Sequence, residues 1–373
     1  MSMGNYARVK RVLEKAKKGE EVTIAFIGGS ITQGAGATPI HLKSYAYQTW
    51  ERFKQNFGEN VKLIKAGVGG TPSELGMIRF ERDVLRNGAV KPDLIVIEFS
   101  VNDEGDETKG LCYESLVRKC LALSDDTAVI LIHAVFANDW NLEERLGPVG
   151  ERYGIPMVSV RQGVVPQFYL KPDTGRVLTK SQFFYDVFHP TNMGHTIMAD
   201  CLIYLMQQID KAPEIAQNDW RSKDPVFGTT FEKVELVDKA WKSELLKEVK
   251  PGSFSEVDVD LHRVEMDDVL EPVAEFPNNW QHVSGSEPFS VKITCKALLI
   301  VSKDSGSAEY GKATVTVDGK EVLTLDPRAV GWTHCTPQII WRGEETAEHL
   351  IEVRMIPGDE EKKMTILGFG VVR

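Results

Sequence analysis

The sequence lacks three features that would each point to a particular class of protein. No apolar run approaches the roughly 18 residues that suggest a membrane span. The five cysteines are scattered, and no two of them are spaced as Cys-x-x-Cys. Residues 1–20 are charged and lack the apolar core of a secretory signal. We therefore expect a cytoplasmic protein with free thiols and no zinc site.

Positive charge is also in short supply, because 44 Lys and Arg face 54 Asp and Glu, which gives a net charge of −10. Nucleic acids and anionic membranes both need a basic surface, so neither is expected as a main partner. The hydrophobic content of 42% is ordinary for a globular protein. A length of 373 residues is long for one core and predicts two or three domains.

The first part of the chain, residues 1–210, alternates apolar strands with helical patterns. The expected strands are 22–27, 61–66, 94–99, 128–133 and 157–160. The expected helices are 5–19, 44–57, 73–86, 113–122 and 193–208. This alternation predicts an α/β domain in which helices cover both faces of a parallel sheet.

The composition changes after residues 211–228, which are predicted to be a linker. Helical periodicity then persists only at 238–247, and short alternating segments take over. These segments are 289–293, 297–302, 313–317, 321–325, 349–355 and 364–372. Asp318-Gly319 predicts a tight hairpin between two of them. We therefore expect a β-sandwich over residues 229–373.

Three of the expected strands end in polar or glycine-rich turns. Gly28-Gly29-Ser30 follows the first strand, Gly67–Thr71 the second, and Asn102 the third. Ligands of parallel α/β sheets bind at the carboxyl ends of the strands, so these turns are candidates for a site. Each also has a structural explanation, because serine caps helices, glycine permits tight turns and asparagine orders them.

A pair of residues before the last helix favours a functional over a structural explanation of these turns. Asp186 and His189 are three apart, a spacing that lets the carboxylate accept from one imidazole nitrogen while the other faces outward. Pro190 keeps His189 extended. A histidine oriented in this way is a general base for a serine, and Ser30 is the candidate nucleophile.

Nucleotide-binding motifs and the α/β-hydrolase elbow fail on single residues. A phosphate loop that begins at Gly29 would need Lys where Ala35 stands. A dinucleotide fingerprint that begins at Gly67 would need Gly where Pro72 stands. The elbow Gly-x-Ser-x-Gly fails at Thr32.

Over about residues 20–208 the sequence resembles the SGNH (GDSL-type) hydrolases. Four short blocks carry the resemblance: Gly29-Ser30, Gly70, Ser100-Val101-Asn102-Asp103 and Asp186-x-x-His189. It implies a flavodoxin-like three-layer fold in which Ser30 is the nucleophile, His189 the base and Asp186 its orienting partner. The oxyanion hole would consist of the backbone N–H groups of Ser30 and Gly70 and the side-chain amide of Asn102. No metal or organic cofactor is implied.

Three positions depart from the pattern of the resembled family. Gly29 stands where Asp often precedes the nucleophile, Ser100 replaces a glycine, and Lys65 replaces an asparagine. None of these changes removes a reacting group, so they bear on the subfamily rather than on the chemistry.

The order of the two domains resembles carbohydrate O-acetylesterases that carry a carbohydrate-binding-type β-sandwich (jelly-roll). In length, domain order and lack of a signal, the sequence resembles in particular the mannan acetylesterases of carbohydrate esterase family seventeen, which implies an acetylated oligosaccharide substrate. Trp140 and Trp332 are candidates for sugar contacts. Two alternatives remain open: a carboxylesterase, lipid or thioester hydrolase on the same scaffold, or a carbohydrate-binding protein without activity.

Four more polar residues lie near these strand ends. His133 is either a second base or part of the site wall, and His195 is expected to be structural. Asp103 is placed to orient the turn of Asn102. Glu98 falls in a buried strand, so we expect it to be paired or at a sheet edge.

Overall fold

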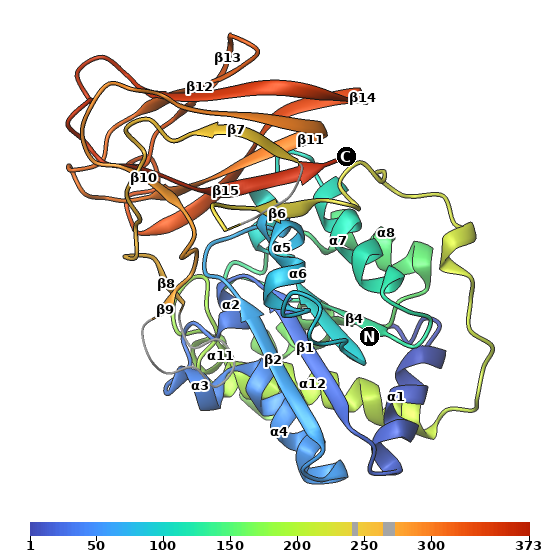
Figure 1. The fold of residues 1–373 in the computed structure, drawn as a ribbon. Coiled ribbons are helices and arrows are strands. Elements are labelled where there is room, and N and C mark those ends of the chain that lie inside the picture. Colours follow the sequence, from blue (N-terminus) through green and yellow to red (C-terminus); the bar gives the residue numbers. More distant parts are fainter. Residues whose placement is uncertain (241–244, 264–272) are drawn as a thin grey trace. The chain divides into compact units, whose positions relative to one another are not determined.

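The computed structural model describes residues 1–240, 245–263 and 273–373. The described chain forms two compact units: residues 1–232 make up the first, and the second begins at Lys233. Figure 1 shows the elements of both. The end of the predicted linker is tied to the first unit, because the backbone N–H groups of residues 226–228 donate to the carboxylate of Glu114.

The first unit is built on a five-stranded, fully parallel sheet in the order β2-β1-β3-β4-β5. Its strands are β1 (Val22–Gly28), β2 (Val61–Gly67), β3 (Leu94–Glu98), β4 (Ala128–His133) and β5 (Met157–Ser159). This is the flavodoxin-like order, whose direction of winding changes between β1 and β3. The turns after β1 and β3 carry Ser30 and Asn102, so both lie at this switch point.

Helices cover both faces of the sheet, as expected (Figure 1). One face carries α1 (Ala7–Lys17), α4 (Tyr45–Phe57) and α12 (Asn192–Lys211), and the other carries α5 (Ser73–Ile78), α7 (Leu111–Ala122) and α8 (Glu143–Tyr153). The shorter helices are α2 (Ser30–Gln33), α3 (Ile40–Lys43), α6 (Phe80–Asp83), α9 (Val160–Gly163), α10 (Val165–Phe168) and α11 (Lys180–Phe183).

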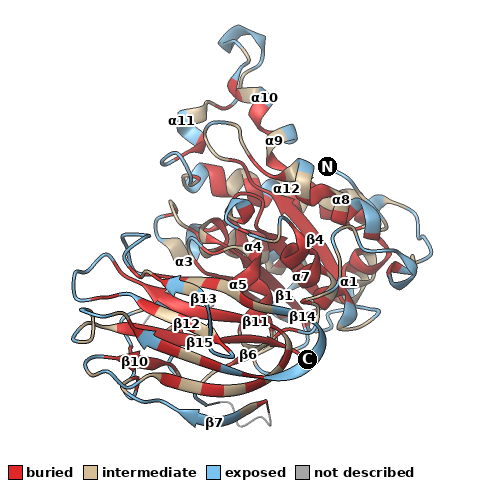
Figure 2. Cartoon of the chain, turned by 90° about the horizontal axis from the view of Figure 1, so that it is seen from above, coloured by how far each residue is buried: buried red, intermediate tan, exposed pale blue. Residues whose placement is uncertain are grey.

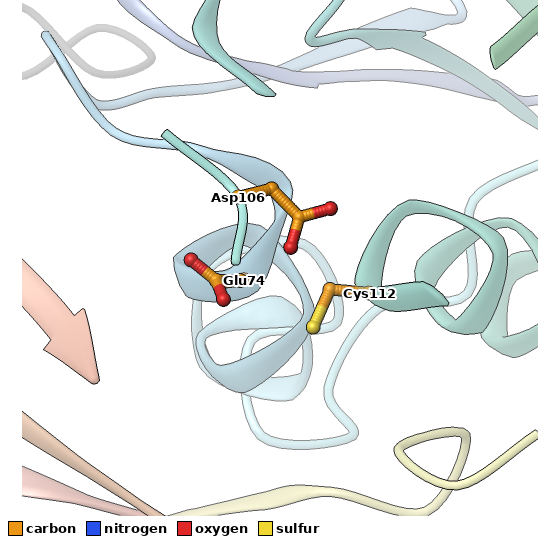
Figure 3. A group of neighbouring side chains, drawn as sticks. All are labelled: Glu74, Asp106 and Cys112. Atoms are coloured by element: carbon orange, nitrogen blue, oxygen red, sulfur yellow. The ribbon is translucent and has the colours of Figure 1, made fainter. Parts of the chain in front are cut away.

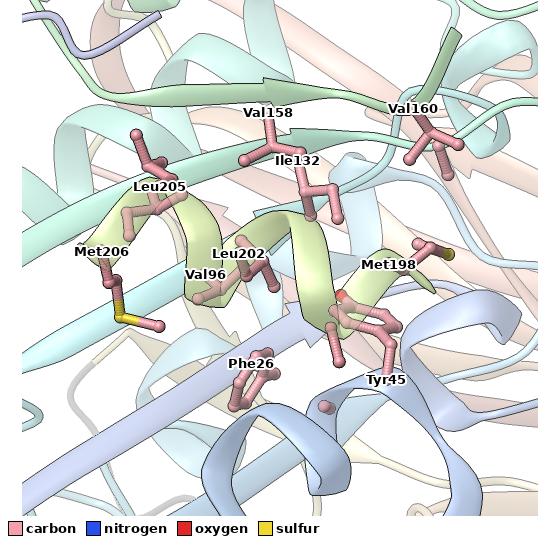
Figure 4. Close-up of a cluster of buried hydrophobic side chains, with 14 of the residues drawn as sticks. Phe26, Tyr45, Val96, Ile132, Val158, Val160, Met198, Leu202, Leu205 and Met206 are labelled. Carbon is pink, nitrogen blue, oxygen red and sulfur yellow. The ribbon is translucent and has the colours of Figure 1, made fainter. Parts of the chain in front are cut away.

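The core under α4 and α12 explains why these helices form where the periodicity predicts them. Met198, Leu202 and Leu205 recur at helical spacing along α12 and are almost completely buried. They pack over Phe26 of β1 and Val96 of β3 (Figure 4). Figure 2 shows the central strands buried on both faces, which is why their sequences are continuous apolar runs.

Two helices differ from the sequence-based prediction. The single helix expected over 73–86 is divided at Arg79, whose fully buried side chain donates to the carbonyl of Gly28 at 3.0 Å. Helix α8 was not predicted, because Pro148 and Gly150 read as helix breakers. A Cβ at Gly150 would overlap Met157, so this glycine lets α8 approach β5.

The second unit is an eight-stranded antiparallel sheet with a separate two-stranded pair. The eight strands are β6 (Glu235–Val237), β7 (Leu246–Lys250), β10 (Trp280–His282), β11 (Phe289–Asp304), β12 (Ala313–Val317), β13 (Lys320–Leu325), β14 (His334–Met355) and β15 (Met364–Val372). The pair is β8 (His262–Arg263) and β9 (Val273–Ala274). The prediction of a parallel α/β domain followed by a β-sandwich is confirmed.

Strand β11 was predicted as two strands, 289–293 and 297–302. The pairing with β14 shifts register between Cys295 and Ala297, so a bulge bends the strand without ending it. Strand β14 is likewise longer than the predicted segment 349–355. The hairpin at Asp318-Gly319 is confirmed: it joins β12 to β13, and both residues have positive φ, 51° and 76°.

The helical prediction for 238–247 is wrong at its end, because β7 begins at Leu246; residues 241–244 lie outside the described part of the chain. All five cysteines are free, as expected. Within the described residues, no helix is both long and apolar enough to cross a membrane.

Candidate active site

Ser30 occupies the first position of α2, directly after β1 ends. The turn is tight, since a Cβ at Gly28 would overlap the side chain of Thr32 and the carbonyl of Glu98. As the first residue of a helix, Ser30 has a backbone N–H without an intrahelical acceptor. The serine therefore presents a hydroxyl and an N–H group at the carboxyl edge of the sheet.

His189 connects Ser30 to Asp186. Its Nε2 lies 3.0 Å from the hydroxyl oxygen of Ser30, and its Nδ1 lies 2.9 Å from Oδ2 of Asp186. Because an ionised carboxylate only accepts hydrogen bonds, the ring proton belongs on Nδ1, and Nε2 is free to accept from the serine. The structure thus brings the three predicted residues together in one hydrogen-bonded chain.

The carboxylate of Asp186 is held in its charged form. Partial burial raises its pKa, but hydrogen bonds from His189 and from the backbone N–H groups of Phe188 and His189 outweigh burial and lower the pKa below its usual value. Both backbone donors lie 2.7 Å from Oδ1. An ionised Asp186 favours the tautomer that leaves Nε2 facing Ser30.

Backbone packing fixes the position of His189, and here the sequence-based prediction missed a residue. A Cβ at Gly36 would lie 3.2 Å from Cβ of His189 and would overlap the carbonyl of Pro190. Gly36 also has a φ of +88°. His195 supports the same turn, since its Nε2 lies 3.0 Å from the carbonyl of Ala35, in agreement with the expected structural role.

Three donors near Ser30 have no acceptor among the described residues. They are the backbone N–H groups of Ser30 and Gly70 and the side-chain amide of Asn102. Gly70 adopts a φ of +71°, and Asn102 lies against the α-carbon of Gly29, where it fills the space of a missing side chain. These are the three groups predicted for the oxyanion hole.

The turns that carry Gly70 and Asn102 are tied to each other by Asp103. Its two carboxyl oxygens lie 2.7 Å from the backbone nitrogen and the hydroxyl of Ser73. Burial raises the pKa of Asp103 to about 8, although the hydrogen bonds with Ser73 oppose that rise. Asp103 therefore fixes the turn of Asn102, as predicted, by anchoring it to α5.

A second link between the same turns is the buried group of Glu74, Asp106 and Cys112 (Figure 3). Their ligand atoms lie within 4.8 Å of one another, which makes this the candidate metal centre among the described residues. However, Asp106 already accepts from Thr108 and Gly110. Burial, with nearby acids including Asp106, raises the pKa of Glu74 to about 9. A neutral Glu74 that is hydrogen-bonded to Asp106 explains the arrangement.

Glu98 and His133 are buried, and neither forms an ion pair within the part of the chain that the structure describes. Because β3 is a central strand, Glu98 does not lie at a sheet edge; its carboxyl is paired instead with Ser100, whose hydroxyl lies 3.4 Å away and whose backbone also hydrogen-bonds to it. Burial raises the pKa of Glu98 to about 8 and lowers that of His133 to about 4. The hydrogen bond of Ser30 goes to His189 and not to His133.

The two candidate tryptophans lie in different units. Trp140 is partly exposed in the first unit and stacks on Phe136, with ring centroids 5.7 Å apart. Trp332 belongs to the second unit, is 50% exposed and lies 4.7 Å from the ring of His334. A role for either in binding sugar stays a prediction.

Comparison with known proteins agrees with this geometry. Residues 26–197 match the GDSL-like Lipase/Acylhydrolase family. The chain contains a GDSL-type hydrolase domain. The resemblance predicted from the four blocks is confirmed, and with it the class of carboxylic ester hydrolases.

The similarity to one solved structure extends beyond this domain. A two-domain esterase (CEX) active on acetylated mannans superimposes with a TM-score of 0.84 at 26% identity, over 100% of this chain and 97% of that one. The same kind of esterase co-crystallised with mannopentaose gives a TM-score of 0.81 at 26% identity, over 99% and 96% of the two chains. No curated protein sequence matches the chain.

Proposed function

We propose that the protein is a serine esterase that removes O-acetyl groups from acetylated oligosaccharides, with mannan-type sugars favoured. The hydrogen-bonded chain from Ser30 through His189 to Asp186 carries the chemical part of this proposal. It supplies a nucleophile, a base and an orienting carboxylate, the three roles that acyl transfer through a serine requires.

In the first half of the reaction, the Ser30 oxygen attacks the ester carbonyl while Nε2 of His189 takes the hydroxyl proton. The carbonyl oxygen becomes an oxyanion, which the N–H groups of Ser30 and Gly70 and the amide of Asn102 stabilise. When the tetrahedral intermediate collapses, the bond to the sugar oxygen breaks. His189 donates its proton to that oxygen, and an acetyl group remains on Ser30.

In the second half, water repeats the sequence. His189 removes a proton from the water as it attacks the acetyl carbonyl, and the same three donors hold the second oxyanion. Collapse returns the proton to the Ser30 oxygen and releases acetic acid, which ionises to acetate and a proton in water. Every atom and proton is accounted for by ester, water and these side chains.

The substrate part of the proposal is supported by the structural similarity. The esterase active on acetylated mannans matches this chain over both units rather than over the hydrolase domain alone. Because that protein matches both units in the same order, the similarity supports its substrate class more directly than a match to the hydrolase fold alone would.

Acetate release from acetylated mannan, acetylated xylan and nitrophenyl esters of short and long acids tests the proposal. We expect release from mannan to be fastest and long-chain esters to be poor substrates. Ser30→Ala should lower kcat at least about a thousandfold, while Ser181→Ala, at an exposed serine of the same unit, should not. Full activity of Ser30→Ala would contradict the mechanism. Equal rates on acetyl and long-chain esters would contradict the substrate.

A further inference from the structure

An exposed aromatic side chain lies directly beside the histidine of the site. Phe188 keeps 49% of its surface exposed. Its backbone is nevertheless fixed, because its N–H donates to Asp186 and the N–H of Tyr185 closes the loop on the carbonyl of His189, at 2.7 and 2.8 Å. Core packing does not explain an apolar ring that a fixed loop holds in solvent, whereas a binding surface does.

Phe188 is one end of an aromatic strip, formed with Phe136 and Trp140. The ring centroid of Phe188 lies 6.1 Å from that of His189 and 5.1 Å from that of Phe136. Phe136 in turn stacks on Trp140 at 5.7 Å with an interplanar angle of 28°. Both Phe136 and Trp140 are partly exposed. The strip therefore leads away from the base along the surface of the first unit.

Backbone hydrogen bonds hold the strip in one shape. The N–H of Ala137 donates to the carbonyl of Val187 at 3.1 Å, which joins the two loops that carry the rings. The N–H of Phe136 donates to the carbonyl of Trp140 at 3.0 Å. Lys180 donates to the carbonyl of Ala137 at 2.8 Å. A surface ordered before binding loses less entropy when a ligand arrives.

The proposed reaction decides which part of the substrate meets this strip. His189 must donate to the oxygen of the departing alcohol, so the alcohol lies on the His189 side of Ser30. The acetyl carbonyl points instead toward Gly70 and Asn102. An apolar surface beside His189 therefore faces the sugar and not the acyl group.

We propose that the aromatic strip binds the sugar part of the substrate: Phe188 stacks on the sugar that bears the acetyl group, and Phe136 and Trp140 contact its neighbours along the chain. This assignment rests on the proposed function. The C–H face of a pyranose is apolar and flat enough to lie on an aromatic ring, and its hydroxyl groups point sideways into water. A lipid surface is less suited, because anionic membranes are repelled by a net charge of −10.

The test compares Phe188→Ala with the wild-type protein on acetylated mannooligosaccharides and on nitrophenyl acetate, whose alcohol is not a sugar. The ratio of kcat/KM for the sugar to kcat/KM for nitrophenyl acetate should fall about tenfold, mainly through KM, which corresponds to the loss of one aromatic contact. Phe188→Trp should restore the ratio. Val187→Ala, at a side chain that is 61% exposed in the same loop, should leave it unchanged.

Three results would overturn the assignment. They are an unchanged ratio in Phe188→Ala, an equal fall with Val187→Ala, and a loss confined to long-chain esters, which would make the strip an acyl or lipid surface. A wild-type protein that hydrolyses nitrophenyl acetate but no acetylated sugar would contradict the proposed function itself. A wild-type protein active on the sugar with an unaffected Phe188→Ala contradicts the strip alone.

Discussion

The carboxyl groups on the two sides of Ser30 are kept in opposite charge states. On the histidine side, Asp186 is partly exposed, accepts three hydrogen bonds, and has a lowered pKa. Behind the turns that carry the oxyanion donors, Glu74, Glu98 and Asp103 are buried, and their pKa values are raised to between about 8 and 9. On the histidine side a charged carboxylate orients the base. Behind the oxyanion donors, neutral acids hold the backbone turns in place.

The largest expected effect comes from removing the charge on the histidine side. Asp186→Asn should lower kcat about 10⁴-fold, because the amide donates toward Nδ1 and favours the wrong imidazole tautomer. The melting temperature should change little, since the side chain is partly exposed. Kinetics on nitrophenyl acetate and a thermal melt check both. Asp173→Asn, at an exposed aspartate of the same unit, is the matched control, and an equal loss there would refute the assignment.

On the other side, loss of the whole group should matter more than loss of its charge. Asp103→Ala removes both contacts with Ser73, so kcat should fall about tenfold, less than when an oxyanion donor itself is deleted. The free energy of unfolding should fall by about 1–3 kcal/mol.

Asp103→Asn is the informative companion to that alanine variant. Its amide can accept from the Ser73 N–H and donate to the hydroxyl, so kcat should stay within about threefold of the wild type. If the asparagine variant were as damaged as the alanine variant, the neutral state assigned to Asp103 would be wrong.

Glu74 offers a test through pH. Its pKa is about 9 in the folded protein and near 4.5 when exposed, so its neutral form stabilises the fold fully below 4.5 and this contribution is lost as pH rises through 9. Between about pH 7 and 10, Glu74→Gln should lose about 3 kcal/mol less unfolding free energy than the wild type. Denaturant titrations at both pH values measure this. Exposed Glu214→Gln should behave as the wild type does, and an identical loss in all three proteins would count against a neutral Glu74.

The smallest effect is expected at Glu98. Glu98→Gln replaces a neutral acid with an amide of the same shape, so kcat near pH 7 should change by less than about twofold. Above the pKa of about 8, the wild type places a charge in β3 next to Gly28, and its activity should decline relative to the glutamine variant. If the pH–rate profiles of the two proteins ran parallel above about pH 8, ionisation of Glu98 would not be the cause of a decline in activity there.

The sequence predicted the groups proposed to react and missed much of what supports them. Ser30, Gly70 and Asn102 were recognisable because each follows an apolar strand, and parallel strands bring their carboxyl ends together. Gly36 and Glu74 carried no such signal. Their roles depend on contacts with residues far along the chain, and only the folded backbone shows which residues those are.

Several element boundaries were missed for the same reason, because contacts between residues far apart in the chain decide them. Local sequence preferences predicted one helix over 73–86. The helix is divided at Arg79, whose buried side chain donates to the carbonyl of Gly28, and a contact between residues so far apart leaves no pattern in the local sequence. Helix α8 was missed because Pro148 disfavours a helix interior, but tertiary packing outweighs that local preference. In the second unit, a bulge in β11 looked like a gap between two strands.

The close packing of Asn102 against Gly29 limits how this protein can be engineered. In the resembled family the position of Gly29 is often Asp, so a designer who stabilises the chain by restoring common residues would choose Gly29→Asp. Here a side chain at position 29 would occupy the volume that the Asn102 amide already fills. Positions 29 and 102 are therefore sterically coupled. Residue 29 can carry a side chain only if the Asn102 turn is changed at the same time.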